Sequence, residues 1–189
     1  IGSDYLAVTQ AVIQDVNQTG GIKGRPLELV VYDDAYTPQL AVKNTMTLIE
    51  KDQVELLLGY VGTPTVTRVL PLLKRFEDRS MMLYFPFTGA EPQRREPYQS
   101  FVYNLRASYL DETDALVRYF RSIGKTKVAV FYQSDAYGRN GWDGVRQALA
   151  THGDTIVVDA SYARGSRFSD SYQSQLSVIQ PMNPDAIIV

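Results

Sequence analysis

The stretch "MMLYFPFTGA", residues 81–90, joins an apolar strand to a polar loop, and this junction decides how the chain folds. Residues 81–85 are apolar or aromatic and predict a buried β-strand. A proline, a phenylalanine and the pair Thr88-Gly89 follow, although a strand that simply turns into a helix needs no such residues. A hydroxyl and a bare backbone N–H can both reach a ligand, so we predict that this strand ends at a binding rim.

The rest of the chain repeats one pattern, in which a short apolar run is followed by an amphipathic stretch. Continuous apolar strands that alternate with amphipathic helices indicate parallel sheets that are buried on both faces. We therefore predict an α/β fold with parallel sheets covered by helices. The first predicted helix places Tyr5, Val8, Val12 and Val16 on one face. The predicted strands are residues 27–32, 55–60, 81–85, 101–106, 127–132, 155–160 and 185–189, and the predicted helices are residues 5–19, 38–51, 66–77, 111–123, 138–150 and 168–179.

Polar residues gather where these strands end. Ligands of open α/β sheets bind beyond the carboxyl ends of the strands, so these positions are the candidates for a site. The chain starts with a helix that no strand precedes and ends on a strand that no helix covers. We therefore expect the fold to be incomplete at both ends, as part of a longer protein. The polar strand ends are residues 33–34, 62–65, 86–89, 106–109 and 134–138.

The composition excludes several classes of function. A net charge of −2 and a pI near 5.4 argue against a nucleic-acid partner, which needs a basic surface. No apolar run approaches the roughly 20 residues that span a bilayer. The chain has no cysteine, which rules out disulfides and thiolate metal sites within it. No G-x-S-x-G motif or Ser/His/Asp set is present, so we predict no catalytic residue, no metal and no cofactor.

Three further motifs have an ordinary structural interpretation beside a functional one. The pair Asp33-Asp34 is compatible with the acidic pocket of a receiver domain, but the further Asp and the Lys of that pocket are missing, so we favour a role in a turn or a helix cap. Residues 137–144, "YGRNGWDG", match neither phosphate-binding glycine motif, and their glycines are expected to allow close helix packing. His152, the only histidine, is expected to cap carbonyls at a helix end.

Five segments, taken together, resemble a known family in order and spacing. They are "GGIKGRPLELVVYDDAYTP", "LLLGYVGTPT", "PFTGAE", "YNLRASYLDET" and "VAVFYQSDAYGRNGWDGV". They are similar to the type I periplasmic binding proteins of the leucine/isoleucine/valine-binding group, the solute receptors of ABC importers. The resemblance runs from about Gly20 to Val189 and implies two Rossmann-like lobes that trap a ligand between them. Residues 1–106 would form the first lobe without its initial strand, and residues 107–189 would begin the second lobe.

The resemblance also implies roles for individual residues. The Thr63 hydroxyl would hold a ligand carboxylate, with Thr65 nearby in the same loop. Phe87 would offer its backbone carbonyl, and Thr88 and Gly89 would complete the carboxylate cradle with a hydroxyl and an N–H. Two aromatic residues would face the ligand from the second lobe: Tyr109 at the first crossover, and Tyr137, which would close over the ligand.

The sequence departs from the family pattern at two points. Tyr36 and Gly62 stand where some members carry a disulfide pair, and the acid that pairs with an amino acid's ammonium group would come from outside these residues. Amino acids, aromatic or aliphatic acids and amides thus all remain open as ligands. Arg106, the one cation near the rim, is interpreted as a tether to Asp111 or Glu112.

The resemblance implies a monomeric, non-enzymatic receptor in the periplasm or outside the cell, which delivers a small carboxylate to an ABC permease. The first candidate ligand is an amino acid of the branched-chain kind. An alternative is the ligand-sensing domain of a signalling receptor or amide-responsive regulator. An enzyme that uses the acidic strand end ranks below both, because no base and nucleophile can be paired.

Overall fold

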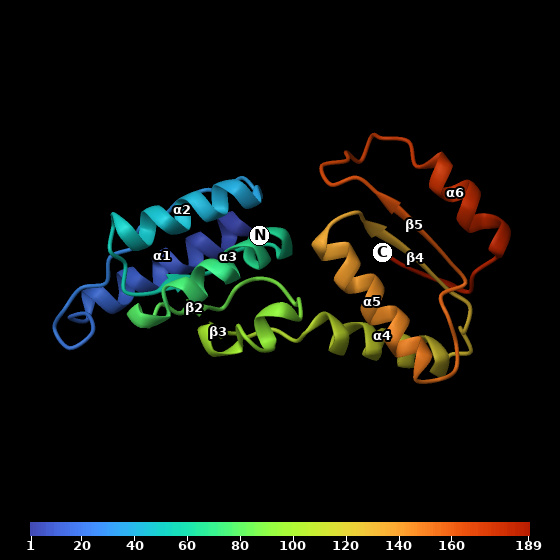
Figure 1. Ribbon diagram of the computed structural model, residues 1–189, viewed down its shortest axis with the longest axis horizontal. Helices are drawn as coiled ribbons and strands as arrows, with labels where there is room; N and C mark the ends of the chain where they lie inside the picture. Colours follow the sequence, from blue (N-terminus) through green and yellow to red (C-terminus); the bar gives the residue numbers. More distant parts are fainter. The chain divides into compact units, whose positions relative to one another are not determined.

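The computed structural model describes residues 1–189 and divides the chain into two compact units (Figure 1). Unit 1 comprises Ile1–Thr88 and Gln93–Leu105, and unit 2 comprises Gly89–Pro92 and Arg106–Val189. The main division therefore falls between residues 105 and 106, next to the predicted boundary. The assignment of the two units as lobes of a larger binding fold stays a prediction.

Unit 1 is built on a parallel sheet of three short strands in the order β1-β2-β3. The strands are β1 (Leu57–Leu58), β2 (Leu83–Tyr84) and β3 (Val102–Tyr103). The opening stretch of the sequence forms a strand, as predicted, and this strand is the central one, because Leu83 pairs with both outer strands. The helices are α1 (Gly2–Gln18), α2 (Pro38–Glu50) and α3 (Thr63–Arg75), and the 3-10 turns are η1 (Glu77–Arg79), η2 (Pro92–Arg94) and η3 (Gln99–Phe101).

The core of unit 1 lies between this sheet and helices α2 and α3, which pack against each other. α3 contributes more buried residues to it than any other element, because Val66, Val69, Leu70 and Leu73 recur at helical spacing and are all fully buried. Pro64 at the start of α3 costs no hydrogen bond, since the first turn of a helix has none to lose. The anchored start of α3 is what fixes the position of Thr63.

The predicted strand at residues 27–32 does not form. A strand exists only with a ladder partner, and no backbone group of residues 28–32 has a hydrogen-bond partner in the structure. The side chain of Asn17 holds only the near end of the segment, where it exchanges two hydrogen bonds with the backbone of Leu27, at 2.7 and 2.8 Å. The predicted apolar face of the first helix is also left largely uncovered, with Val8 65% and Val12 57% exposed.

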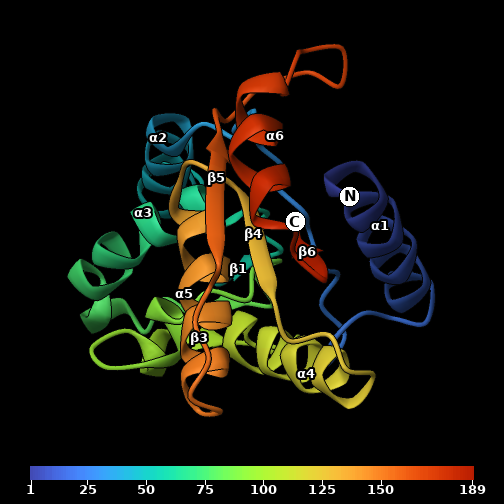
Figure 2. The same cartoon turned by 90° about the vertical axis from the view of Figure 1, so that its right-hand side faces the viewer.

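Unit 2 carries a second parallel sheet, in the order β5-β4-β6. Its strands are β4 (Val128–Gln133), β5 (Val158–Tyr162) and β6 (Ala186–Ile188), and its helices are α4 (Tyr109–Ser122), α5 (Ala136–Ala150) and α6 (Gln173–Ile179), with the turn η4 (Gln180–Met182). Figure 2 shows α5 and α6 on opposite faces of this sheet. The face toward α4 and α5 holds the core cluster, which consists of Val117, Val128, Val130, Val145, Ala148 and Leu149. The α/β fold with helix-covered parallel sheets is thus confirmed.

Helix α6 begins five residues later than predicted, at Gln173 instead of residue 168. A local turn competes with the helix: Asp170 accepts the N–H of Arg167 at 2.7 Å and donates its own N–H to the Arg167 carbonyl at 3.0 Å. The two bonds close residues 167–170 into a turn and delay the helix. None of the helices in either unit has the length and apolar character of a membrane span.

The buried phenol of Tyr60 makes unit 1 sensitive to alkali. Its hydroxyl lies 2.7 Å from that of Thr45, and burial raises the pKa of Tyr60 to about 12. Below about pH 10 the phenol is neutral in both states, whereas between about pH 10 and pH 12 only the unfolded chain ionises, so stability falls across that window. We expect the ionisation of Tyr60 to lower the free energy of unfolding by up to about 3 kcal/mol across this window. Urea unfolding across the window should show this loss in the parent protein and not in Tyr60→Phe; equal pH dependence would contradict the assignment.

Candidate functional site

Unit 1 brings two of the predicted site residues into direct contact. The hydroxyl oxygens of Thr63 and Thr88 lie 2.7 Å apart, although the residues are 25 positions apart in the chain. Thr63 is the first residue of α3, and Thr88 follows the end of β2. Both are buried, at 1% and 0% exposure. We call them the hydroxyl pair.

The hydroxyl pair consists of two neutral polar groups. A threonine hydroxyl can donate one hydrogen bond and can accept others, and one of the two donates across the pair. Groups of this kind recognise polar ligands, and a carboxylate bound to them would also polarise the bond between the two threonines. The pair therefore has the chemistry of a small neutral donor site.

Thr65, also predicted as a site residue, has a different role. Its buried hydroxyl donates back to the carbonyls of Val61 and Gly62, both at 2.9 Å. A threonine hydroxyl has one proton, so Thr65 has none left for a carboxylate. Its side chain steadies the entry into α3.

Phe87 holds the loops of unit 1 together through its backbone. It donates to Tyr60 O at 2.7 Å, and its carbonyl accepts the N–H of Gly62 at 3.2 Å. The contact of the Phe87 carbonyl with a ligand stays a prediction. The cross-link joins the loop of Thr88 to the residue directly before Thr63.

Gln93 is a residue that the sequence analysis missed. It is fully buried, and its Nε2 donates to the Thr88 carbonyl at 3.3 Å, while its Oε1 has no partner. A glutamine within the charged stretch "EPQRREP" carries no sequence signal of burial. The structure shows that it supports the Thr88 loop from inside unit 1.

Unit 2 brings together the other three predicted residues, beginning with Gly89 and Tyr109. The Tyr109 N–H donates to the Gly89 carbonyl at 2.7 Å, and a Cβ on residue 89 would come within 2.6 Å of the Tyr109 ring. Residue 89 is thus a glycine because an aromatic ring lies against its backbone. Tyr109 in turn opens α4, where Ser108 and Asp111 form a capping box.

Tyr137 joins the same group in unit 2. Its ring lies 5.5 Å from that of Tyr109 in a T-shaped arrangement, and its side chain remains 42% exposed. Burial, with Tyr109 as a smaller cause, raises the pKa of the Tyr137 hydroxyl, which is therefore neutral at physiological pH. Asp135 caps α5 by accepting the N–H groups of Tyr137 and Gly138, at 2.9 and 3.2 Å.

Arg106 is held by an acidic residue, as predicted. Its guanidinium forms an ion pair with Glu112 and lies 5.2 Å from the centre of the Tyr109 ring. Asp111, the other proposed tether, belongs instead to the capping box. The cation nearest to the predicted rim is therefore engaged within unit 2.

The other motifs resolve into structural roles, with two corrections. Asp33 and Asp34 hold a turn, as favoured. In "YGRNGWDG" the packing role holds for Gly138 and Gly144, but a Cβ on residue 141 would meet no atom within 4 Å, so the expectation is wrong there. The helix-end cap assigned to the His152 side chain is also wrong: the hydroxyl of the neighbouring Thr151 donates to the Ala148 carbonyl, and His152 contributes only its backbone N–H.

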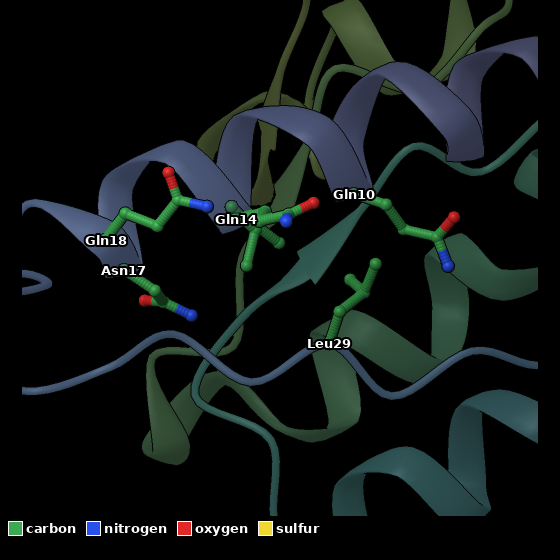
Figure 3. Close-up of a pocket in the computed structure, with 6 residues that line it drawn as sticks. Gln10, Gln14, Asn17, Gln18 and Leu29 are labelled. Atoms are coloured by element: carbon green, nitrogen blue, oxygen red, sulfur yellow. The ribbon is translucent and has the colours of Figure 1, made fainter.

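A cavity of about 480 Å³ lies elsewhere in unit 1, between α1 and the unpaired segment at residues 27–32 (Figure 3). It contains none of the predicted site residues. Figure 3 shows amide side chains of α1 and the side chain of Leu29 along it. The lining residues are Gln10, Ile13, Gln14, Asn17, Gln18 and Leu29.

The chemistry of the predicted residues is that of recognition. Hydroxyls, a backbone carbonyl and neutral phenols can bind a polar ligand, but they supply no base or nucleophile pair. No group of three or more His, Cys, Asp or Glu side chains is placed to hold a metal ion. The fold and these residues are those of an α/β protein with a candidate recognition site. The family described as "Periplasmic binding protein" matches residues 1–189, and the chain belongs to this family.

Individual relatives agree with the family. An amino acid binding protein from Pseudomonas aeruginosa is 26% identical over 169 residues, which are 88% of this chain and 44% of that protein. A crystal structure of a substrate-binding periplasmic protein from Ralstonia solanacearum matches with a TM-score of 0.77 and 30% identity over 87% of this chain and 45% of that chain. A possible leucine/isoleucine/valine-binding protein from Rhodopirellula baltica matches with a TM-score of 0.81 and 27% identity over 94% of this chain and 48% of that chain. The chain thus spans about half the length of these relatives.

Proposed function

We propose that the full-length protein is an extracytoplasmic receptor that binds a small carboxylate and delivers it to the permease of an ABC importer as a monomer. The first candidate ligand is an amino acid with a branched aliphatic side chain. One observation carries the proposal: the buried hydroxyl pair of Thr63 and Thr88, at the carboxyl end of a parallel sheet. That edge is where α/β proteins bind their ligands.

A carboxylate suits this site without a cation. Hydrogen bonds between neutral donors and an ionised acceptor are shorter and stronger than those between neutral groups. Thr63 also stands at the first position of α3, a helix of 13 residues, whose N-terminus carries a partial positive charge. The donor pair and the helix end therefore favour the same charge in the ligand.

The proposed roles follow the geometry of each unit. The hydroxyl pair donates to the carboxylate, and the Phe87 carbonyl accepts from a donor on the ligand. Gly89 contributes its N–H. Thr65 supports the loop.

Tyr109 and Tyr137 are proposed to contact the ligand from unit 2. Their edge-to-face arrangement leaves Tyr137 partly exposed, with a neutral hydroxyl at its tip. A phenol of this kind offers both an apolar face and a hydrogen bond.

The relatives support the class of ligand. The names of two of them refer to amino acids, and one names leucine, isoleucine and valine. The family description refers to the periplasm, which supports the proposed location.

Calorimetry on the full-length protein tests the proposal. The panel should contain branched-chain and other amino acids, aromatic acids, and the matching amides, which lack the carboxylate charge. We expect saturable one-site binding of a carboxylate, no binding of its amide, and recovery of the ligand unchanged. Binding of the amide with equal affinity, binding of no member of the panel, or turnover of any of them would contradict it.

A further inference from the structure

The aromatic ring of Tyr36 lies on the bare backbone of Gly62, the residue directly before Thr63. A Cβ on residue 62 would come within 2.7 Å of Tyr36 Cδ2 and closer still to Cε2. Gly62 has φ 105°, a conformation that a residue with a side chain rarely adopts. Ring and glycine thus fit together at the point where the chain enters α3.

The turn that carries Tyr36 is strained. Ala35 and Tyr36 both have positive φ, 47° and 57°, and neither is a glycine. Two consecutive residues in this region cost conformational free energy, and such strain persists only where the surroundings impose it.

Asp33 and Asp34, the two acidic residues singled out in the sequence, impose this backbone strain. Asp33 Oδ1 accepts the N–H of Ala35 at 2.7 Å, and Asp34 Oδ1 accepts the N–H of Tyr36 at 2.8 Å. Asn44 on α2 also donates to the Asp33 carbonyl, at 3.1 Å. Neither acid is the cap residue of α2: that residue is Thr37, whose side chain makes no capping hydrogen bond. The pair therefore serves the turn alone.

We propose that residues 33–36, which we call the Tyr36 turn, act as a positioning device for the hydroxyl pair. Tyr36 is the positioning residue: it holds Gly62, and Gly62 sets the start of α3 and so the Thr63 hydroxyl. Gly62 passes this constraint on through two backbone bonds, by donating to Phe87 O at 3.2 Å and accepting from the Val66 N–H at 3.0 Å. The strained turn, the acidic pair and the glycine are then parts of one device.

Binding measurements test the positioning role of Tyr36, and this test rests on the proposed function, since it needs a ligand. In the full-length protein, Tyr36→Phe keeps the ring and should bind the best ligand of the panel within about twofold of the parent. Tyr36→Ala removes the ring and should weaken binding about tenfold, the equivalent of about 1.4 kcal/mol. Tyr32→Ala is the matched control, because Tyr32 is a similarly exposed tyrosine four residues earlier, and it should stay within about twofold.

Amide hydrogen exchange in the ligand-free protein separates this inference from the proposed function. The amides of Gly62 and Val66 should exchange at least about tenfold faster in Tyr36→Ala than in Tyr36→Phe, because an opened local structure loses protection. If the parent protein binds nothing, the proposed function fails, and exchange alone decides the inference. In a protein that binds, the inference is overturned if either the affinity or the exchange rate stays unchanged in Tyr36→Ala. If Tyr36→Ala does not fold, Tyr36→Leu takes its place, and the same changes in affinity and exchange rate are expected of it.

Discussion

Thr63→Ala is expected to weaken binding of the carboxylate ligand by about ten- to a hundredfold. The substitution removes one charge-assisted hydrogen bond to a buried anion, a loss of about 1.5–3 kcal/mol, and about 1.4 kcal/mol corresponds to each factor of ten. The helix itself should survive, because Gly62 rather than the Thr63 side chain is the cap residue of α3. Calorimetry with the best ligand of the panel measures the effect.

The partner substitution sharpens this test. Because the two hydroxyls lie 2.7 Å apart, the loss of either should disable both, so Thr63→Ala with Thr88→Ala should cost little more than the worse single change. Thr47→Ala is the matched control: its hydroxyl bonds back to the Lys43 carbonyl on α2, and binding should stay within about twofold. Strictly additive losses, or unchanged affinity in Thr63→Ala, would show that the pair does not hold the ligand.

The contact between Thr63 and Thr88 was within reach of sequence reasoning. Two parallel strands end at the same edge of a sheet, so hydroxyls that follow them must lie near each other once the strands are neighbours. β1 and β2 are neighbours, paired through Leu57 and Leu83. The apolar runs predicted the strands, and the contact follows from the pairing of those strands in the structure.

The direction of individual side chains was out of reach. Thr65 follows the same strand as Thr63, yet its hydroxyl turns back to the backbone, a choice set by helix geometry over a few residues. Gln93 is buried in the folded chain, where its amide donates to the Thr88 carbonyl. Such outcomes depend on tertiary packing and leave no trace in composition or periodicity.

Two predicted elements differ from the structure because secondary structure is conditional on its surroundings. Residues 27–32 have a strand-like sequence, but a strand is defined by its neighbours, and this segment has none in the structure. α6 starts late because Asp170 offers its backbone a competing turn. In both places local sequence preference and the available partners point in different directions.

Gly138→Ala is expected to destabilise unit 2 by about 3 kcal/mol, the upper range for overpacking a filled site. The new methyl group would meet backbone atoms of Gln133, with the carbonyl carbon and the amide nitrogen both at 2.8 Å and the oxygen closer still. Backbone atoms at the end of a central strand cannot swing aside as a flexible side chain can. β4 and α5 would have to move apart, at the cost of the packing of Val145 and Leu149 in the core cluster.

Gly141→Ala, on the same helix, is expected to change the stability of unit 2 in the opposite direction. A methyl group at residue 141 meets no atom within 4 Å, and alanine in a helix restricts the unfolded chain, so this change should stabilise unit 2 by about 0.5–1 kcal/mol. Trp142, the only tryptophan, packs against the core cluster of unit 2, so its fluorescence during urea unfolding reports on this unit. Equal effects of the two substitutions would refute the close approach of α5 to Gln133, because helix propensity alone would then govern both glycines.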